Sequence, residues 1–171
     1  MRKALAILLL TLATSLPALA LWPATAEAAV TPTRAERRVL GAINIVRAAH
    51  DLAPLRFRPS LVRAARAHAR DMAGRDVLTH LSDNGWTVGT RVRYFGYTTD
   101  GCTFWKAGEN IACAQVGSGF ATSRAIVSLW MDSPDHREVL LTRSFRDIGV
   151  GIRLSGDGWR YFTVDLGRRI D

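Results

Sequence analysis

The spacing of the apolar residues changes along the chain, and this change constrains the fold more than any other feature. In the first part of the sequence apolar residues recur every three or four positions, whereas from Ile148 to Leu166 they alternate with small or polar residues. The first pattern is typical of amphipathic helices and the second of strands with one apolar face. Helices first and strands last predict an α+β fold in which helices cover a small antiparallel sheet.

The predicted helices are bounded by caps and prolines. The first extends from Thr33 to His50, where Thr33 and Glu36 can form a capping box. Pro59 opens the second helix, whose inner face carries Leu61, Ala65, Ala69 and Met72. His68 lies beside that face, so we expect a packed structural histidine rather than a ligand.

Shorter elements are predicted after a polar loop over 76–85, which contains His80. Helices are expected at about 87–95 and 121–131, and a strand at 108–114. A further helix is predicted to begin at Pro134, with Ser133 as its cap, which places His136 in the first helical turn. The segments 148–154 and 159–166 flank a Ser-Gly-Asp-Gly turn and predict an antiparallel hairpin.

The N-terminal segment is typical of a signal peptide. Arg2 and Lys3 precede an apolar run, and small residues follow, so residues 1–28 are predicted to be removed after Ala28, with Ala20 as the second choice. An uncleaved membrane anchor is the alternative. Residues 29–171 are then expected to form one exported domain, with a core at about 34–167 and no transmembrane segment after cleavage.

The net charge of +8 comes almost entirely from arginine residues spread over every predicted element. Nucleic-acid binding usually needs cations gathered on one face, so it is not expected. A solvated basic surface is the first interpretation, and attraction to anionic cell-wall polymers or lipid headgroups is the second.

The chain contains two cysteines, Cys102 and Cys113. In an oxidising compartment a disulfide between them is the natural expectation, with two thiols as the alternative. A zinc site built on cysteine would need further thiolates or closely spaced histidines, and the sequence offers neither.

Several motifs occur in a fixed order: the segments 64–72, 78–80, 93–97, Gly108-Glu109-Asn110-Ile111-Ala112, 130–137 and 145–151. Together they resemble the CAP superfamily, which comprises the cysteine-rich secretory proteins, antigen 5 and plant pathogenesis-related proteins. The resemblance extends from Arg34 to Gly167. It implies an α-β-α sandwich with a cleft.

The family places two histidines and two acids at the floor of this cleft. Matched by motif, these positions correspond to His80, His136 and Glu109. Ser133 stands where animal and plant members have a glutamate, so the second acid is absent or is replaced by Asp132 or Asp135.

Two chemical interpretations of His80, Glu109 and His136 remain open. The two imidazoles could hold Zn²⁺ or another divalent metal with water, and Glu109 could then act as a general base. The simpler interpretation is a hydrogen-bonded polar cluster that requires no cofactor. No confident catalytic residue emerges, because the sequence contains no compact metalloprotease motif or nucleophile elbow.

Three classes of function therefore follow. The favoured one is a secreted, non-enzymatic binding or interaction module for a lipid-like ligand, a divalent metal, or a cell-envelope or host partner. The second is a zinc-dependent hydrolase that uses His80, His136 and Glu109. The third is a structural protein of the cell envelope, for which no cleft would be needed.

Overall fold

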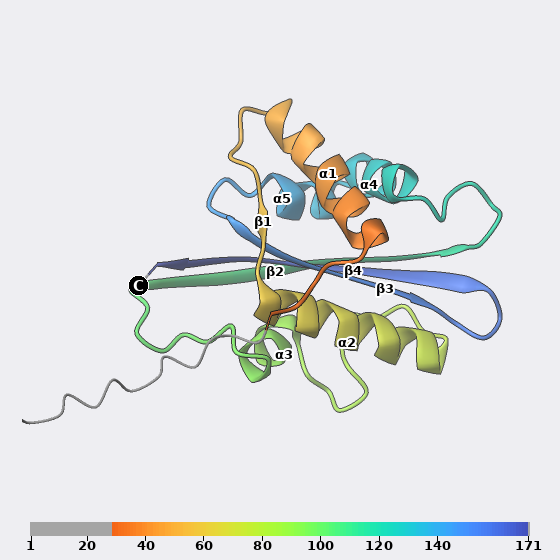
Figure 1. Cartoon of the computed structure of the whole chain (residues 1–171), viewed down its shortest axis with the longest axis horizontal. Coiled ribbons are helices and arrows are strands. Elements are labelled where there is room, and N and C mark those ends of the chain that lie inside the picture. Colours follow the sequence, from red (N-terminus) through yellow and green to blue (C-terminus); the bar gives the residue numbers. More distant parts are fainter. Residues whose placement is uncertain (1–28, 171) are drawn as a thin grey trace, which may run out of the picture.

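The structure, a computed structural model, describes residues 29–170 as a three-layer α-β-α sandwich (Figure 1). One helical layer contains α1 (Arg34–Ala48), α4 (Ser123–Asp132) and α5 (Pro134–Leu141). The opposite layer contains α2 (Pro59–Arg75) and α3 (Val88–Tyr94). The predicted α+β class and sandwich are confirmed. The predicted signal peptide, residues 1–28, lies outside the described residues.

The sheet between the helical layers has four strands in the order β1-β3-β4-β2. Their bounds are β1 Arg56–Phe57, β2 Phe104–Gln115, β3 Asp147–Leu154 and β4 Trp159–Ile170. The expected hairpin is the antiparallel pair β3–β4, and β2 pairs antiparallel with β4 along its whole length. The sheet is nevertheless mixed, because the short β1 pairs in parallel with β3. This pairing was missed because two residues carry no periodic signal.

Local signals in the sequence set the helix starts. At α1, the Glu36 N–H donates to Thr33 Oγ1 at 3.2 Å and the Thr33 N–H donates to Glu36 Oε2 at 2.6 Å, which is the predicted capping box. Pro59 occupies the first turn of α2, as expected. Helix α4 begins at Ser123, two positions after the predicted start, because the Thr122 side chain caps it.

The main core lies between the sheet and the layer of α1, α4 and α5. Val39 and Ile43 of α1 meet Trp130 of α4 and the inward side chains of β3 and β4, all of them buried. The Trp130 indole N–H also donates to Ile111 O at 3.0 Å, which ties α4 to β2. This layer therefore holds the start of α5 at a fixed distance from β2.

The opposite face of β3 packs directly on the backbone of α2. A β-carbon at Gly149 would lie 2.0 Å from the Leu61 carbonyl carbon, and one at Gly151 would lie 2.2 Å from Ala65 O. The alternation of β3 thus combines an apolar face with a glycine face that a helix covers. This close approach fixes α2, and with it His68, against the sheet.

The predicted disulfide is not formed in the structure, where Cys102 and Cys113 are not bonded to each other. Cys102 precedes β2, and Cys113 lies near the far end of this extended strand. A strand rises about 3.3 Å per residue, so the Cα atoms of Phe104, where β2 begins, and Cys113 are roughly 30 Å apart, whereas bonded cysteines need Cα atoms within about 7 Å. The expectation was wrong because the intervening segment is a single straight strand rather than a loop.

Among the described residues, 29–170, the helices are too short or too polar for any of them to cross a membrane.

Candidate functional site

The predicted site is centred on Glu109, which lies on the edge strand β2 with a side chain that is 2% exposed. Its two carboxylate oxygens have different partners. Oε1 accepts a hydrogen bond from His80 Nδ1 at 2.8 Å, and Oε2 is paired with the guanidinium of Arg91 on α3. His68 Nε2 on α2 is 3.7 Å from the same Oε2 atom and 2.9 Å from Thr79 O. Glu109 therefore ties α2, α3 and the His80 loop to the sheet.

A second buried acid lies beside Glu109. Asp165 on β4 is directly opposite Glu109 in the β2–β4 register, and its side chain is completely buried. Its nearest cation is Arg91, whose Nη2 is 3.9 Å from Asp165 Oδ1. Arg91 therefore faces both carboxyl groups.

The pKa values of the two acids are shifted in opposite directions. Burial, followed by the neighbouring charge of Glu109, raises the pKa of Asp165 well above its ordinary value. Burial also opposes ionisation of Glu109, but the hydrogen bond from His80 and the charge of Arg91 outweigh it and lower the Glu109 pKa. The two shifts run in opposite directions, so ionisation is favoured at Glu109 and opposed at Asp165.

The two predicted histidines approach β2 from opposite layers of the sandwich. His80 lies in the loop after α2 with 58% of its side chain exposed, and its hydrogen bond to Glu109 raises its pKa against the opposing effect of burial. His136 lies in the first turn of α5, and its pKa is lowered by burial and then by the charge of His80. Asn110 of β2 donates from Nδ2 to His136 O at 2.9 Å, which fixes that turn against the strand.

Ser133 takes a role that the sequence did not reveal. Its hydroxyl is 2.9 Å from His136 Nδ1, and its side chain does not cap α5. Ser133 stands at the position where animal and plant members of the family have a glutamate. Asp135 affects His136 only through its charge, so a hydroxyl group, rather than a carboxylate, orients the second imidazole here.

Arg91 and Asp165 were not predicted from the sequence. Arg91 sits on a short helix of seven residues and looks like a surface residue, although it is 2% exposed. The sequence gives only a weak indication of Asp165, which is an acidic residue within the alternating apolar pattern of β4. Once helices cover both faces of the sheet, such an acid needs a partner.

The donor set around His80 and His136 suits a metal ion only in part. Each histidine uses Nδ1 in a hydrogen bond, to Glu109 and Ser133 respectively, so each keeps Nε2 available. A hydrogen bond at the other ring nitrogen is typical of metal-ligating histidines. Within residues 29–170, however, no group of three or more histidine, cysteine or acidic side chains is arranged so that it could hold a metal ion. Two histidine nitrogens are fewer ligands than a closed structural zinc site needs.

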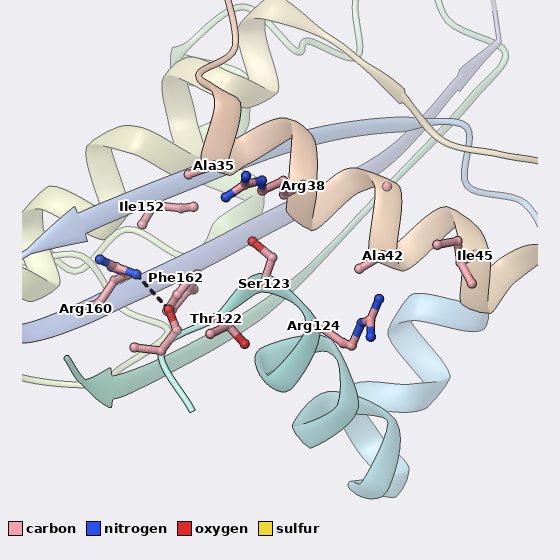
Figure 2. A pocket seen from close by; sticks show the side chains of 12 residues that line it. Ala35, Arg38, Ala42, Ile45, Thr122, Ser123, Arg124, Ile152, Arg160 and Phe162 are labelled. Carbon is pink, nitrogen blue, oxygen red and sulfur yellow. Dashed lines mark hydrogen bonds between the residues drawn. The ribbon is translucent and has the colours of Figure 1, made fainter. Parts of the chain in front are cut away.

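A cavity of about 520 Å³ lies between α1 and the start of α4, away from the His–Glu cluster (Figure 2). Its apolar walls include Ala42 and Ile45 of α1 and Ile152 and Phe162 of the sheet. Three arginines, Arg38, Arg124 and Arg160, also line it. In Figure 2 the Arg124 side chain extends from α4 toward α1.

The three arginines of this cavity are held differently. Arg160 Nη1 donates to Ala121 O at 2.7 Å, the dashed line in Figure 2, and this bond fixes its side chain. Arg38 and Arg124 are exposed, and within residues 29–170 neither forms an ion pair or a side-chain hydrogen bond. The cavity therefore combines an apolar wall with two cations that have no counter-ion in this part of the chain.

A second cavity, of about 360 Å³, opens at the other edge of α4. It is lined by apolar and neutral side chains: Cys113, Ala114, Gln115, Ser118, Phe120, Ala125, Ile126, Leu129 and Trp159. None of these lining residues is charged, so the cavity could not select an acidic ligand.

Together, the sandwich and the His–Glu cluster on its edge strand define an α-β-α protein with a polar cluster beside the sheet. Residues 40–166 match the sequence profile of the cysteine-rich secretory protein family, CAP, and the chain belongs to this family. The "uncharacterized protein YkwD" of Bacillus subtilis is 33% identical over 144 residues, which cover 80% of this chain. The chain spans about half of that relative, 52% of its length.

Solved structures share the fold. An outer surface protein from Borrelia burgdorferi has a TM-score of 0.66 at 21% identity, covering 78% of this chain and 91% of that one. An extracellular protein containing a SCP domain from Bacillus anthracis has a TM-score of 0.61 at 27% identity, covering 78% of this chain and 40% of that one. The first likeness is one of fold alone, and the second relative is described as extracellular.

Proposed function

We propose that this chain is an exported CAP-family binding module that takes a lipid-like anion, such as a long-chain fatty acid, in the cavity between α1 and α4. The observation that carries the proposal is the pairing of an apolar wall with Arg38 and Arg124. A fatty acid presents the matching combination of an alkyl chain and one carboxylate.

The size and shape of the cavity support this proposal. A volume of about 520 Å³ is within the range of small-molecule sites, which are mostly apolar with a few placed polar groups. An Arg guanidinium binds a carboxylate through two parallel hydrogen bonds, so Arg124 and Arg38 are suited to the head group. A role as a purely structural envelope protein would need no such cavity.

Export is supported by the residues at the start of the chain, where a positive pair precedes an apolar run and small residues. The extracellular description of the Bacillus anthracis relative supports it as well. Attachment to the cell envelope would fit the same observations.

The arrangement around Glu109 supports binding over hydrolysis. A general base must accept a proton from the attacking water, yet Glu109 already accepts from His80 through Oε1 and from Arg91 through Oε2. Its side chain is also only 2% exposed, so an attacking water has little access to either oxygen. A zinc-dependent hydrolase that uses His80, His136 and Glu109 is therefore the weaker alternative.

Calorimetric titration of the purified protein with dodecanoate tests the proposal, with dodecanol as a probe of equal chain length and no charge. We expect saturable binding of dodecanoate, weaker binding of dodecanol, and at least tenfold weaker binding of dodecanoate by Arg124→Gln. Arg153→Gln is the control, because Arg153 is exposed on β3 outside this cavity and carries the same charge. Equal binding by both variants, or no binding, would contradict the proposal.

A second candidate function is binding of a divalent metal by His80 and His136. The specific observation is that both rings keep Nε2 available while Nδ1 is held by Glu109 or Ser133. Zinc bound there would lower the pKa of a coordinated water. Zinc titration of the protein and of the His80→Ala/His136→Ala double variant tests this candidate: stoichiometric uptake lost in the variant supports it, and unchanged uptake removes it.

A further inference from the structure

A third cavity lies at the opposite end of β3 and β4 from the α1–α4 cavity. Its volume is about 400 Å³, and it is lined by Arg56, Arg146 and Arg168 together with Asp147, Ala53 and Pro54. The three arginines come from the start of β1, the residue before β3 and the end of β4. We call the cavity lined by these six residues the arginine cavity.

Backbone pairing holds the walls of the arginine cavity in place. The Arg56 N–H donates to Arg146 O at 2.9 Å, and the Arg146 N–H donates to Gly167 O at 3.0 Å. Arg56 is also in register with Asp147 on the neighbouring strand. Three adjacent chain segments thus present cations to one space, although those segments are far apart in the sequence.

The charge of the arginine cavity is not neutralised by the part of the chain that is described. Within residues 29–170, none of its three arginines lies within 4.0 Å of a carboxylate oxygen. The one acid in the wall, Asp147, accepts a hydrogen bond from the Tyr97 hydroxyl at 2.8 Å through Oδ2. Three positive charges therefore face one negative charge.

Neighbouring groups add further positive charge. Lys106 on β2 is directly opposite Arg168 in the β2–β4 register, an arrangement of like charges that destabilises a sheet. Arg47 is fully buried behind the cavity, where its guanidinium donates only to backbone carbonyls, Ala53 O among them. Burial and then the charge of Arg146 lower the pKa of Arg47. A bound anion would relieve this repulsion.

We infer that the arginine cavity binds a phosphate group. Several guanidinium groups that approach from different strands suit a tetrahedral anion with three or four acceptor oxygens, and arginine forms bidentate bonds to phosphate. A planar carboxylate can use fewer of them. The phosphate could be a soluble monoester or the phosphodiester of an anionic envelope polymer. This site is separate from the cavity of the proposed function.

The test is calorimetric titration of the purified protein with three probes at constant ionic strength. Pyrophosphate and glycerol 3-phosphate represent free phosphates and monoesters, and glycerophosphoglycerol represents a phosphodiester. We expect saturable binding of at least one probe. Binding of the diester assigns the site to a polymer, and binding of the monoester or pyrophosphate alone assigns it to a soluble phosphate.

Two variants keep the test independent of folding defects. Arg168→Gln and Arg56→Gln each remove one cavity cation whose side chain forms no hydrogen bond or ion pair within residues 29–170. Each is expected to weaken phosphate binding at least tenfold, while Arg153→Gln, at the other end of β3, leaves it within twofold. Absence of binding by every probe would overturn the inference. An equal loss in Arg153→Gln would overturn it as well, because phosphate would then be attracted by the overall positive charge of the protein and not by the arginine cavity.

Discussion

Glu109 and Asp165 lie directly opposite each other on β2 and β4, and one guanidinium, that of Arg91, faces both of their carboxyl groups. Ionisation is favoured at Glu109 and opposed at Asp165, because a second negative charge in this buried place would have to share the same cation. The cluster therefore favours a negative charge on Glu109 and a proton on Asp165.

Replacement of Asp165 by asparagine should stabilise the folded protein. The raised pKa of Asp165 means that the folded protein keeps a proton that the unfolded chain releases above the ordinary pKa of aspartate. Asp165 therefore lowers the free energy of unfolding as pH rises toward neutral. Asparagine carries no charge and so removes this cost, and we expect a gain on the order of 1 kcal/mol at pH 7.

Urea unfolding of Asp165→Asn and the unchanged protein between pH 4 and pH 7 measures this effect. The difference in unfolding free energy should shrink toward pH 4, where the unfolded carboxyl group also begins to hold its proton. A variant that is less stable at pH 7 would show that Asp165 is ionised in the folded protein.

Replacement of Glu109 by glutamine removes the negative charge beside Arg91. Asp165 can then ionise in its place, so we expect a moderate loss of about 2 kcal/mol. The double variant Glu109→Gln/Asp165→Asn leaves Arg91 buried without either of its acidic partners, and its loss should reach about 3–5 kcal/mol.

A double-mutant cycle by urea unfolding checks this coupling. The two single changes add to a loss of about 1 kcal/mol, so the predicted cycle is strongly non-additive. Glu138→Gln on the exposed face of α5 is the control, with a change within about 0.5 kcal/mol. An additive cycle would show that Arg91 does not hold both acids together.

His80 should titrate at a higher pH than His136. The hydrogen bond to Glu109 raises the pKa of His80, whereas burial and the charge of His80 lower the pKa of His136. Ring-proton NMR between pH 5 and pH 8 should therefore show His80 titrating above His136. In Glu109→Gln the His80 pKa should fall. The reverse order, or no change of His80 in that variant, would contradict the observed hydrogen bond.

The contact between β3 and α2 should not tolerate a side chain at Gly149. Gly149→Ala would place a β-carbon 2.0 Å from the Leu61 carbonyl carbon and 2.1 Å from Leu61 O. Backbone atoms cannot move aside as a flexible side chain can, so we expect a loss of about 3 kcal/mol or more. Thermal unfolding measures it. Gly156→Ala, which meets no atom within 4 Å, should change stability by no more than about 0.5 kcal/mol.

Much of the fold could be predicted because its signals are local. The capping box of Thr33 and Glu36, proline at the start of α2, and the alternation of β3 each act within a few residues. The resemblance to the CAP family added the sandwich, which periodicity alone does not specify. The pairing of β1 with β3 could not be predicted, because it joins residues far apart in the sequence through a two-residue strand.

The candidate site was predictable only in part, for a similar reason. The motif located Glu109 and His80, and the structure joins them by a hydrogen bond. Arg91 and Asp165 depend on tertiary packing, since only the fold brings α3 and β4 to the same carboxylate. The disulfide expectation rested on the compartment and the number of cysteines, and not on the straight strand that separates Cys102 from Cys113.

The most direct test of the proposed function locates the bound ligand. Backbone NMR spectra of the ¹⁵N-labelled protein would be recorded during titration with dodecanoate. Binding between α1 and α4 predicts that the largest shifts occur for Ala42, Ile45, Thr122 and Ser123, which line that cavity. Shifts concentrated at Phe120 and Leu129 in the uncharged cavity, or around His80 and His136, or no shifts at all, would contradict it.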